Sequence, residues 1–327
     1  MGFEVVLGQS RVVKYLKRAI QKNRIAHAYL FVGPEGVGKT LVAKLLAAQV
    51  MGQDCNGCLV CGRCKSILWG NHPDLLTVTP LNKEVTIEQI RSLREEILNP
   101  PFEAPTRFIL MQYAHKMTLE ASNAFLKVLE EPNKGNVFIL ESPDEGLLLP
   151  TIVSRCVKLP FGPISKEEVA VFLREKYDLV PDEAQALAAI SNGSIKKAIQ
   201  FMEKGLLKRR AEIFYDHTEA IKRTLGEGPS SPHDTIIPKD VDPSDYLFLL
   251  LTWYRDLIAS AVGVKSQFFF HQDFSTKLKE LSKGSHLHSL LSIPLEIERA
   301  RQDMGKEANF GLLMGELFLA FKDGLGI

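Results

Sequence analysis

The residues best suited to chemistry form a glycine-rich loop at positions 33–40, with the sequence GPEGVGKT. It fits the phosphate-loop pattern G-x-x-x-x-G-K-[ST] without a mismatch, after a short apolar run and before a helical pattern. The backbone N–H groups of such a loop surround phosphates, and the positive end of the next helix faces them. The alternative is a chance glycine turn, which the flanking patterns disfavour. The expected ligand is ATP with Mg²⁺, held by Gly33, Gly36, Gly38, Lys39 and Thr40.

The acidic motif that should accompany this loop is missing. In P-loop ATPases a second buried strand ends in an Asp that holds magnesium, and in ATPases of this kind a following Glu polarises water. Here the apolar run at residues 108–111 is followed by Gln112 and Tyr113. Loss of a positioned general base typically costs ~10²- to 10⁴-fold in rate, so we expect slow or absent hydrolysis. An alternative alignment uses Glu130 and Glu131, but these follow a helical pattern and not an apolar strand.

A cysteine cluster with regular two-residue gaps suggests a metal site. Its members are Cys55, Cys58, Cys61 and Cys64. Glycines in the same segment allow the tight turns that bring four sulfurs to one ion, and four protein ligands make a closed, structural Zn²⁺ site. An iron–sulfur centre is the alternative, but that cysteine run usually has a three-residue last gap and a trailing proline, whereas here Lys65 follows. Buried free thiols are disfavoured because the segment is polar.

Alternating helical patterns and short apolar runs dominate the first half of the chain, which is typical of parallel strands joined by crossover helices. Strands are expected at residues 28–32, 75–79, 107–112, 137–141 and 156–159. A helix with a capping box is expected to begin at Thr86. From Pro163 the pattern is purely helical, with a capping box at Ser165, a helix starting at Pro181 and a break at Asn192-Gly193.

This pattern predicts an α/β P-loop domain with a parallel sheet, then a small helical domain and an all-helical C-terminal domain. The expected boundaries are 1–162, 163–206 and 207–327, with the cysteine knuckle inserted in the first domain at about residues 52–66. Residues 226–243 are rich in Gly, Pro, Ser and Asp and are expected to form a loop.

Composition excludes several classes of protein. Forty basic and 39 acidic residues give a net charge of +1, so no global field for nonspecific DNA binding exists, and any DNA contact must be local. No apolar run approaches the ~20 residues of a membrane span, and the first residues do not resemble a secretory signal. We therefore expect a cytoplasmic protein. The chain also lacks a visible cluster of metal-binding carboxylates for nucleotide polymerisation.

Several motifs together resemble bacterial clamp-loader subunits of the AAA+ class. They extend from Gly8-Gln9 to the helical segment around Lys196. The motifs are Gly8-Gln9, HAYLF at residues 27–31, the phosphate loop, the cysteine knuckle, NHPD at residues 71–74, ASNAFLKVLEEP at residues 121–132 and LPTIVSRC at residues 149–156. The resemblance implies an AAA+ module, a helical lid and a C-terminal collar.

The same resemblance implies a pentameric ring with gamma/tau and delta subunits, which loads a sliding clamp onto primed DNA as part of the DNA polymerase III holoenzyme. Polymerase activity would then belong to the holoenzyme and not to this chain. The missing acids and the motif at residues 71–74 favour the delta-prime type, and an active gamma/tau-type motor subunit is the alternative. An iron–sulfur redox protein is a more remote one. Two departures stand out: the first cysteine gap is shorter than usual, and the phosphate loop is intact although many delta-prime chains have lost it, which leaves ATP binding open.

By position, the resemblance makes Arg155 an arginine finger that reaches the ATP of a neighbouring motor subunit. Such an arginine is worth ~10³ to 10⁵ in rate. Ser142 would be the first sensor and Lys196 the sensor of the lid. Plain alternatives exist for each: a surface arginine, a serine that caps a strand end, and a lysine on a solvated helix face.

Overall fold

The computed structural model describes residues 2–52, 58–132, 135–223, 241–304 and 310–325. Contacts divide it into two compact units, Met1–Glu168 with Gly193–Lys196 and Val169–Asn192 with Lys197–Ile327. This division does not separate the expected lid from the expected collar, so the boundary at residues 206 and 207 stays a prediction. Among the described helices, none combines the length and apolar character of a membrane span.

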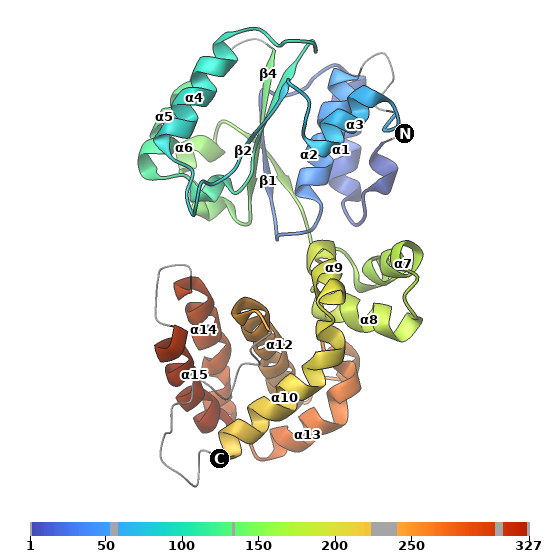
Figure 1. Cartoon of the computed structure of the whole chain (residues 1–327), viewed down its shortest axis with the longest axis vertical. Helices are drawn as coiled ribbons and strands as arrows, with labels where there is room; N and C mark the ends of the chain where they lie inside the picture. The colour runs from blue at the N-terminus through green and yellow to red at the C-terminus, as the bar shows by residue number, and fades with distance from the viewer. Residues whose placement is uncertain (1, 53–57, 133–134, 224–240, 305–309, 326–327) are drawn as a thin grey trace. The chain divides into compact units, whose positions relative to one another are not determined.

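A five-stranded parallel sheet forms the centre of the first unit, with the order β2-β3-β4-β1-β5 (Figure 1). Val32 of β1 lies opposite Ser142 of β4, and Met111 of β3 lies opposite Leu140 of β4. The carboxyl ends of these three strands therefore lie side by side. The strands are β1 (Ala28–Val32), β2 (Leu75–Val78), β3 (Arg107–Met111), β4 (Asn136–Ser142) and β5 (Val157–Pro160), each within one residue of its predicted bounds.

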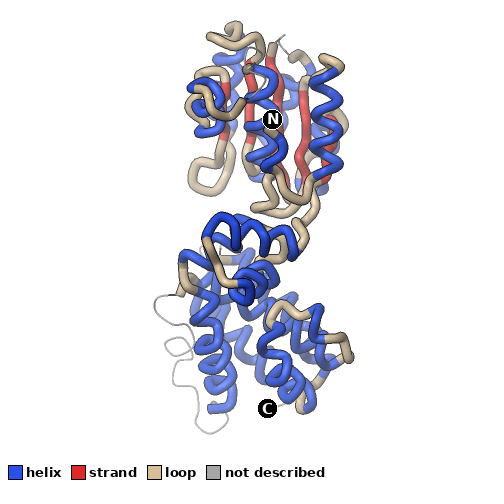
Figure 2. The backbone as a smooth tube through the Cα atoms, turned by 90° about the vertical axis from the view of Figure 1, so that its right-hand side faces the viewer, coloured by secondary structure: helices blue, strands red, loops and turns tan. Residues whose placement is uncertain are grey.

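Helices cover both faces of the sheet, as Figures 1 and 2 show. Side chains alternate along the strands, so Tyr29 and Phe31 pack into one apolar cluster while Ala28 and Leu30 pack into the other. The first cluster contains side chains from α1 (Ser10–Gln21), α2 (Lys39–Met51) and α3 (Gly62–Trp69), and the second from α4 (Ile87–Leu98), α5 (Leu119–Glu130) and α6 (Pro150–Val153). Short 3₁₀ helices are η1 (Phe3–Val5), η3 (Ala114–Lys116) and η4 (Glu145–Leu147).

The C-terminal part is helical, as predicted. Its helices are α7 (Lys166–Tyr177), α8 (Pro181–Ile190), α9 (Ile195–Glu203), α10 (Leu206–Arg223), α12 (Pro243–Ala261), α13 (Ser275–Lys283), α14 (Leu287–Asp303) and α15 (Phe310–Leu325), with 3₁₀ helices η5 (Ser266–Phe268) and η6 (Gln272–Phe274). The helix start at Pro181 is confirmed, as are the capping boxes at Thr86 and Ser165. Of the predicted loop at residues 226–243, positions 226–240 lie outside the described residues.

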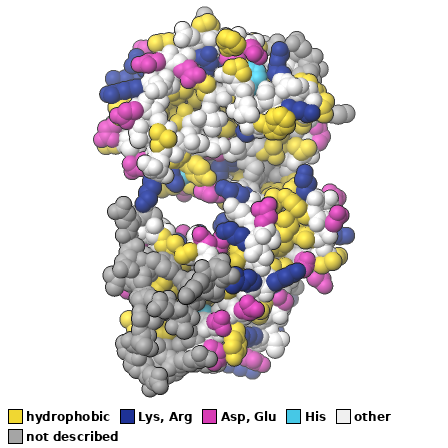
Figure 3. All heavy atoms as spheres, in the orientation of Figure 1, with side chains coloured by type: hydrophobic (Ala, Val, Ile, Leu, Met, Phe, Trp, Pro, Cys, Tyr) yellow, Lys and Arg dark blue, Asp and Glu magenta, His cyan; other side chains and the backbone are white. Residues whose placement is uncertain are grey.

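Aromatic side chains form the centre of the helical unit. The Phe214 and Trp253 rings stack with centroids 4.2 Å apart, and Tyr254 stacks on Phe321 at 4.8 Å. These residues therefore belong to the core. On the face shown in Figure 3, basic and acidic side chains of the described residues intermingle.

Candidate functional site

The phosphate loop connects β1 to α2 in the predicted way. Gly36 and Gly38 have φ angles of 77° and 98°, in the left-handed region that favours glycine, and Gly38 is the N-cap of α2. The Gly33 amide donates to the Ser142 carbonyl oxygen at 3.0 Å, which ties the loop to the end of β4. The Lys39 ammonium donates to the carbonyl oxygens of Gly33 (2.5 Å) and Pro34 (2.7 Å). The carbonyl oxygens of the loop thus bind the ammonium group of Lys39.

A buried carboxyl group, Glu141, lies against this loop. The Thr40 hydroxyl donates to Glu141 Oε2 at 2.9 Å, while Oε1 has no hydrogen-bond partner among the described residues. Burial raises the Glu141 pKa to about 7, although the Thr40 hydrogen bond and the charges of Lys39 and Lys44 act in the opposite direction. Burial lowers the Lys39 pKa, against the charges of Glu141 and Glu35. Two lysines and one acid therefore share a poorly solvated space at the loop.

Glu141 is absent from the residues that the sequence predicts for this site. A signal does exist: residues 137–140 are Val-Phe-Ile-Leu, so Glu141 follows an apolar run in the manner expected of the missing acid on β3. The run alone could not place it beside Thr40.

The end of β3 carries no acid, as predicted. The Gln112 amide donates to the Val78 carbonyl oxygen at 3.0 Å, which continues the ladder, and Tyr113 adopts a left-handed conformation with φ of 53°. His115 follows, with its ring centroid 6.2 Å from that of Tyr113 and its buried Nδ1 unpartnered within the described part of the chain. Burial lowers the His115 pKa, and the charges of Lys116 and Lys39 act in the same direction, whereas Glu35 opposes them.

The segment around Lys196 approaches the phosphate loop within the same unit. A Cβ atom at Gly36 would lie 2.1 Å from Ser194 Oγ and 2.7 Å from Lys196 Cβ, so only glycine fits at this position. The predicted lid sensor is therefore close to the loop. Ser142 is almost fully buried, and its hydroxyl donates to the Asp144 carbonyl oxygen at 2.5 Å.

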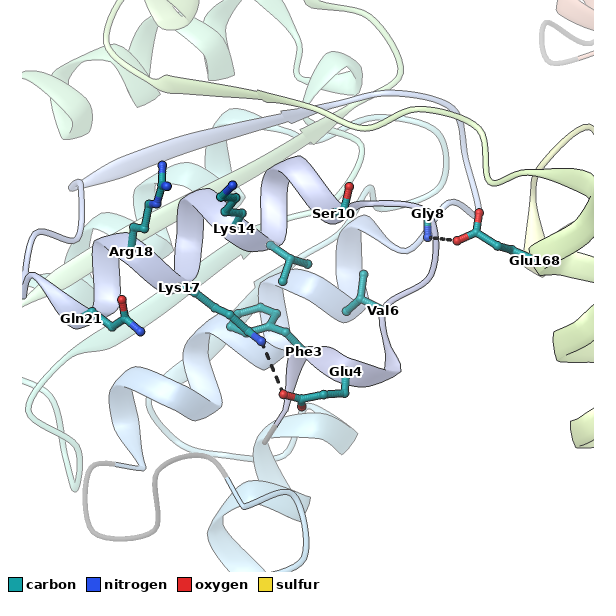
Figure 4. Close-up of a pocket in the computed structure, with 11 residues that line it drawn as sticks. Phe3, Glu4, Val6, Gly8, Ser10, Lys14, Lys17, Arg18, Gln21 and Glu168 are labelled. Carbon is teal, nitrogen blue, oxygen red and sulfur yellow. Dashed lines mark hydrogen bonds and ion pairs between the residues drawn. The ribbon is translucent and has the colours of Figure 1, made fainter.

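The Gly8-Gln9 pair connects the loop to the start of the helical part. The buried Gln9 side chain donates to Gly162 O at 2.8 Å and to Val37 O at 3.4 Å, and it accepts from the Gly162 amide at 3.2 Å. The Gly8 amide donates to Glu168 Oε1 at 3.2 Å, at the end of a groove of about 750 Å³ along α1 (Figure 4). Within this groove Lys17 pairs with Glu4 at 3.4 Å.

Arg155 lies at the other edge of the sheet. It comes two residues before β5, which runs parallel to β1, so it lies near the amino ends of the strands while the phosphate loop follows the carboxyl end of β1. At about 3.3 Å per residue, the five residues of β1 separate the two edges by roughly 16 Å. The partly exposed Arg155 side chain donates to Glu130 Oε1 (2.8 Å) and to Thr151 O (2.9 Å).

This contact also places Glu130 at the C-terminal end of α5 and not at the end of a strand beside the phosphate loop. Arg155 cannot reach the nucleotide site of its own chain across the sheet.

Three of the four predicted cysteine ligands converge. The sulfur atoms of Cys58, Cys61 and Cys64 lie within 4.8 Å of one another, whereas Cys55 lies outside the described residues. Amide hydrogen bonds run from Cys61 N to Cys58 Sγ (3.3 Å) and from Cys64 N to Cys61 Sγ (3.4 Å), the latter capping α3. Sulfurs around one zinc ion would be about 3.8 Å apart, so this arrangement fits a single ion that all of them share.

The motif at residues 71–74 has a structural role. The fully buried Asp74 carboxylate accepts from the amides of Phe102 (2.6 Å), Glu103 (2.8 Å) and Ala104 (2.9 Å), and it lies 3.6 Å from the Arg107 guanidinium. Burial acts to raise the Asp74 pKa, but these hydrogen bonds and the Arg107 charge outweigh it and lower the pKa. Asp74 thereby fixes the loop that leads into β3.

Comparison with known proteins gives a consistent family. The model of the family described as DNA polymerase III, delta subunit, matches residues 8–165. DNA polymerase III subunit delta' from Bacillus subtilis is 31% identical over 322 residues, which cover 97% of this chain and 97% of the relative. The chain belongs to the DNA polymerase III delta-prime family. The delta' subunit from Pseudomonas aeruginosa is 32% identical over 71% of this chain and 70% of its own length.

A tau subunit also matches the chain, over a smaller share of its own length. DNA polymerase III subunit tau from Bacillus subtilis is 27% identical over 78% of this chain but only 50% of its own length. The predicted fold class, an α/β P-loop AAA+ domain with a parallel sheet followed by a helical C-terminal region, is confirmed, while the division of that region into lid and collar stays a prediction.

Proposed function

We propose that this chain is a clamp-loader subunit that hydrolyses ATP poorly and supplies Arg155 in trans to the ATP of a neighbouring subunit. The position of Arg155 carries the proposal: a partly exposed arginine at the sheet edge opposite its own phosphate loop can act only on a nucleotide held by another chain. Glu130 holds the guanidinium in an exposed ion pair, which costs little to exchange for a phosphate.

The composition of its own site supports weak turnover. Gln112 and Tyr113 occupy the positions of the metal-holding Asp and the water-polarising Glu. Neither an amide nor a phenol supplies a negative charge or a general base at neutral pH. The left-handed glycines of the loop and the position of Lys39 and Thr40 at the start of α2 support binding of ATP without cleavage.

The remaining assignments follow from the same family. The chain would act in the cytoplasm with gamma/tau and delta subunits in a pentameric ring that loads the sliding clamp onto primed DNA. The knuckle of Cys55, Cys58, Cys61 and Cys64 would hold a structural Zn²⁺ that fixes α3 against the sheet. Ser142 and Lys196 would lie near the nucleotide phosphates.

Reconstitution of the ring tests the role of Arg155. Arg155→Ala should leave assembly with tau and delta subunits unchanged, while single-turnover hydrolysis at the one neighbouring site falls ~10³-fold or more. Arg155→Lys should rescue little, because lysine lacks the planar fork of arginine. Arg94→Ala, an exposed arginine of α4, is the matched control and should have no effect. Unchanged hydrolysis in the Arg155→Ala ring would contradict the proposal.

A further inference from the structure

The phosphate loop contacts a buried acid whose hydrogen bonds are incomplete. Glu141 is only 7% exposed, and among the described residues its Oε1 atom has no partner. A buried carboxylate without full pairing costs free energy unless a water molecule, an ion or a ligand completes its hydrogen bonds. Thr40 donates one hydrogen bond to Oε2, which leaves Oε1 for something that is not part of the chain.

The spacing of two oxygen atoms indicates what that ligand is. Magnesium takes octahedral oxygen ligands at about 2.0–2.1 Å, so neighbouring ligand atoms are about 2.9 Å apart. Thr40 Oγ1 and Glu141 Oε2 are separated by 2.9 Å. The Thr40 hydroxyl is the magnesium ligand of the phosphate-loop pattern. A separation of 2.9 Å is that of an ordinary hydrogen bond, and it also suits two adjacent ligand positions around one magnesium ion. The contact with Thr40 therefore places the Glu141 carboxyl group, with its unpartnered Oε1, on the magnesium side of the loop.

The sheet register explains how an acid from another strand arrives there. Leu140 of β4 lies opposite Met111 of β3, so Glu141 and Gln112 take the next positions on neighbouring parallel strands. Both lie at the carboxyl edge of the sheet, and Glu141 pairs with Phe31 of β1, two residues before the loop begins. Position 112 on β3 thus lacks a carboxyl group, whereas Glu141 supplies one on β4, the strand between β3 and β1.

We propose that Glu141 replaces the missing acid of β3 as the carboxylate on the magnesium side of the nucleotide site. The inference rests on the nucleotide site of the proposed function but not on the role of Arg155. It also separates binding from turnover: Glu141 contacts Thr40, the metal ligand, while Tyr113 occupies the position of the group that polarises water. Such a site holds Mg²⁺ and ATP without activating a nucleophile.

The test is the magnesium dependence of ATP binding to the full chain, measured calorimetrically with a Mg²⁺ titration and with excess EDTA. In Glu141→Gln, the Mg²⁺ concentration that gives half of the gain in affinity should rise about 10- to 100-fold, as for loss of a residue that supports a metal. ATP affinity in EDTA should be kept. Glu96→Gln removes an exposed carboxylate at the C-terminal end of α4, beside the amino end of β3 and away from the loop, and it should shift this concentration less than about twofold.

Two results for Glu141→Gln would overturn the inference. One is an unchanged magnesium dependence. The other is an equal gain in ATP affinity with and without Mg²⁺, which would mean that Glu141 only repels phosphate. Absence of ATP binding by the unaltered chain would also overturn it, yet would leave the role of Arg155 intact, because that role is measured on the ATP of the neighbouring subunit. Lys39→Ala should abolish binding in every condition and shows that the signal comes from this loop.

Discussion

The helical unit and the phosphate-loop site both bury ionisable side chains, but they differ in how many hydrogen-bond partners these side chains have. In the helical unit, Asp256 accepts from the amides of Phe270 (3.0 Å) and His271 (2.7 Å), and the His271 ring contacts Arg210 and Thr252, each at 3.0 Å. At the phosphate loop, Glu141 has one hydroxyl partner, and the buried Nδ1 of His115 has none within the described ranges.

This difference distinguishes buried polar groups that stabilise the fold from buried polar groups that bind a ligand. A polar network whose members complete one another fixes a unique packing, and removal of one member leaves the others buried and unpaired. His217 follows the same rule, since its ring lies between the hydroxyl groups of Tyr254 (2.9 Å) and Tyr246 (3.2 Å). An incomplete set beside a glycine-rich loop instead indicates a place for a ligand.

The largest expected effect comes from damage to the complete network. Asp256→Ala should lower the free energy of unfolding of the helical unit by about 3 kcal/mol or more, because two amides lose a buried acceptor and the buried Arg210 loses a nearby opposite charge. The fluorescence of Trp253, which is buried in this core, can report the transition in urea. Glu296→Ala, which removes an exposed ion pair with Arg299, should change it by less than about 0.5 kcal/mol. Equal losses of stability in Asp256→Ala and Glu296→Ala would contradict a structural role for the buried network.

At Glu141, beside the phosphate loop, a substitution should raise the free energy of unfolding and not lower it. The Glu141 pKa is raised from 4.5 to about 7, so the folded state binds the proton more tightly than the unfolded state. Its contribution to stability therefore falls as pH rises from about 4.5 to about 7 and stays lower above that. Without ligand, Glu141→Gln should stabilise the first unit by about 2–3 kcal/mol at pH 8 and by little below pH 4.5. Thermal unfolding at both pH values measures this.

His217 provides the contrast in pH dependence. Burial lowers its pKa from 6.5 to about 3, so its contribution to stability is complete above about 6.5 and is lost as pH falls toward 3.

A destabilising effect of Glu141→Gln at pH 8 would contradict the prediction for that variant. It would mean that Glu141 belongs to a structural network like that of the helical unit.

A smaller effect is expected at the cysteine knuckle. Removal of zinc by a chelator, or Cys64→Ser, should destabilise the first unit by about 2 kcal/mol, because in α3 the Cys64 and Ile67 side chains reach the core. Metal analysis should give one zinc per chain before treatment. Cys156→Ser is the matched control, since burial raises the Cys156 pKa to about 12 and keeps this thiol out of metal chemistry. Equal loss of zinc in Cys64→Ser and Cys156→Ser would contradict a zinc site at the cysteine knuckle.

Much of the fold could be predicted from the sequence because its signals are local. Short apolar runs predicted the strand bounds within one residue, and the cap residues at Thr86 and Ser165 predicted helix starts. The phosphate loop needs only glycines at fixed spacing between a strand and a helix. Glu141 could not be predicted, because its importance depends on the strand order that places β4 between β3 and β1.

Two further features also required tertiary structure. The ion pair of Arg155 joins residues 25 positions apart, so neither local pattern nor motif reveals that Glu130 holds the guanidinium. Asp74 has the appearance of a functional acid in the sequence, yet its three amide donors come from residues 102–104 and make it an anchor of the fold.

The most direct test of the account is single-turnover hydrolysis by the isolated chain, with bound ATP measured in the same samples. We expect the chain to bind ATP in the presence of Mg²⁺ and to leave it uncleaved, and we expect Gln112→Asp with Tyr113→Glu to raise the rate of cleavage. Prompt release of phosphate by the unaltered chain, abolished by Lys39→Ala, would contradict it and would make this chain a motor subunit.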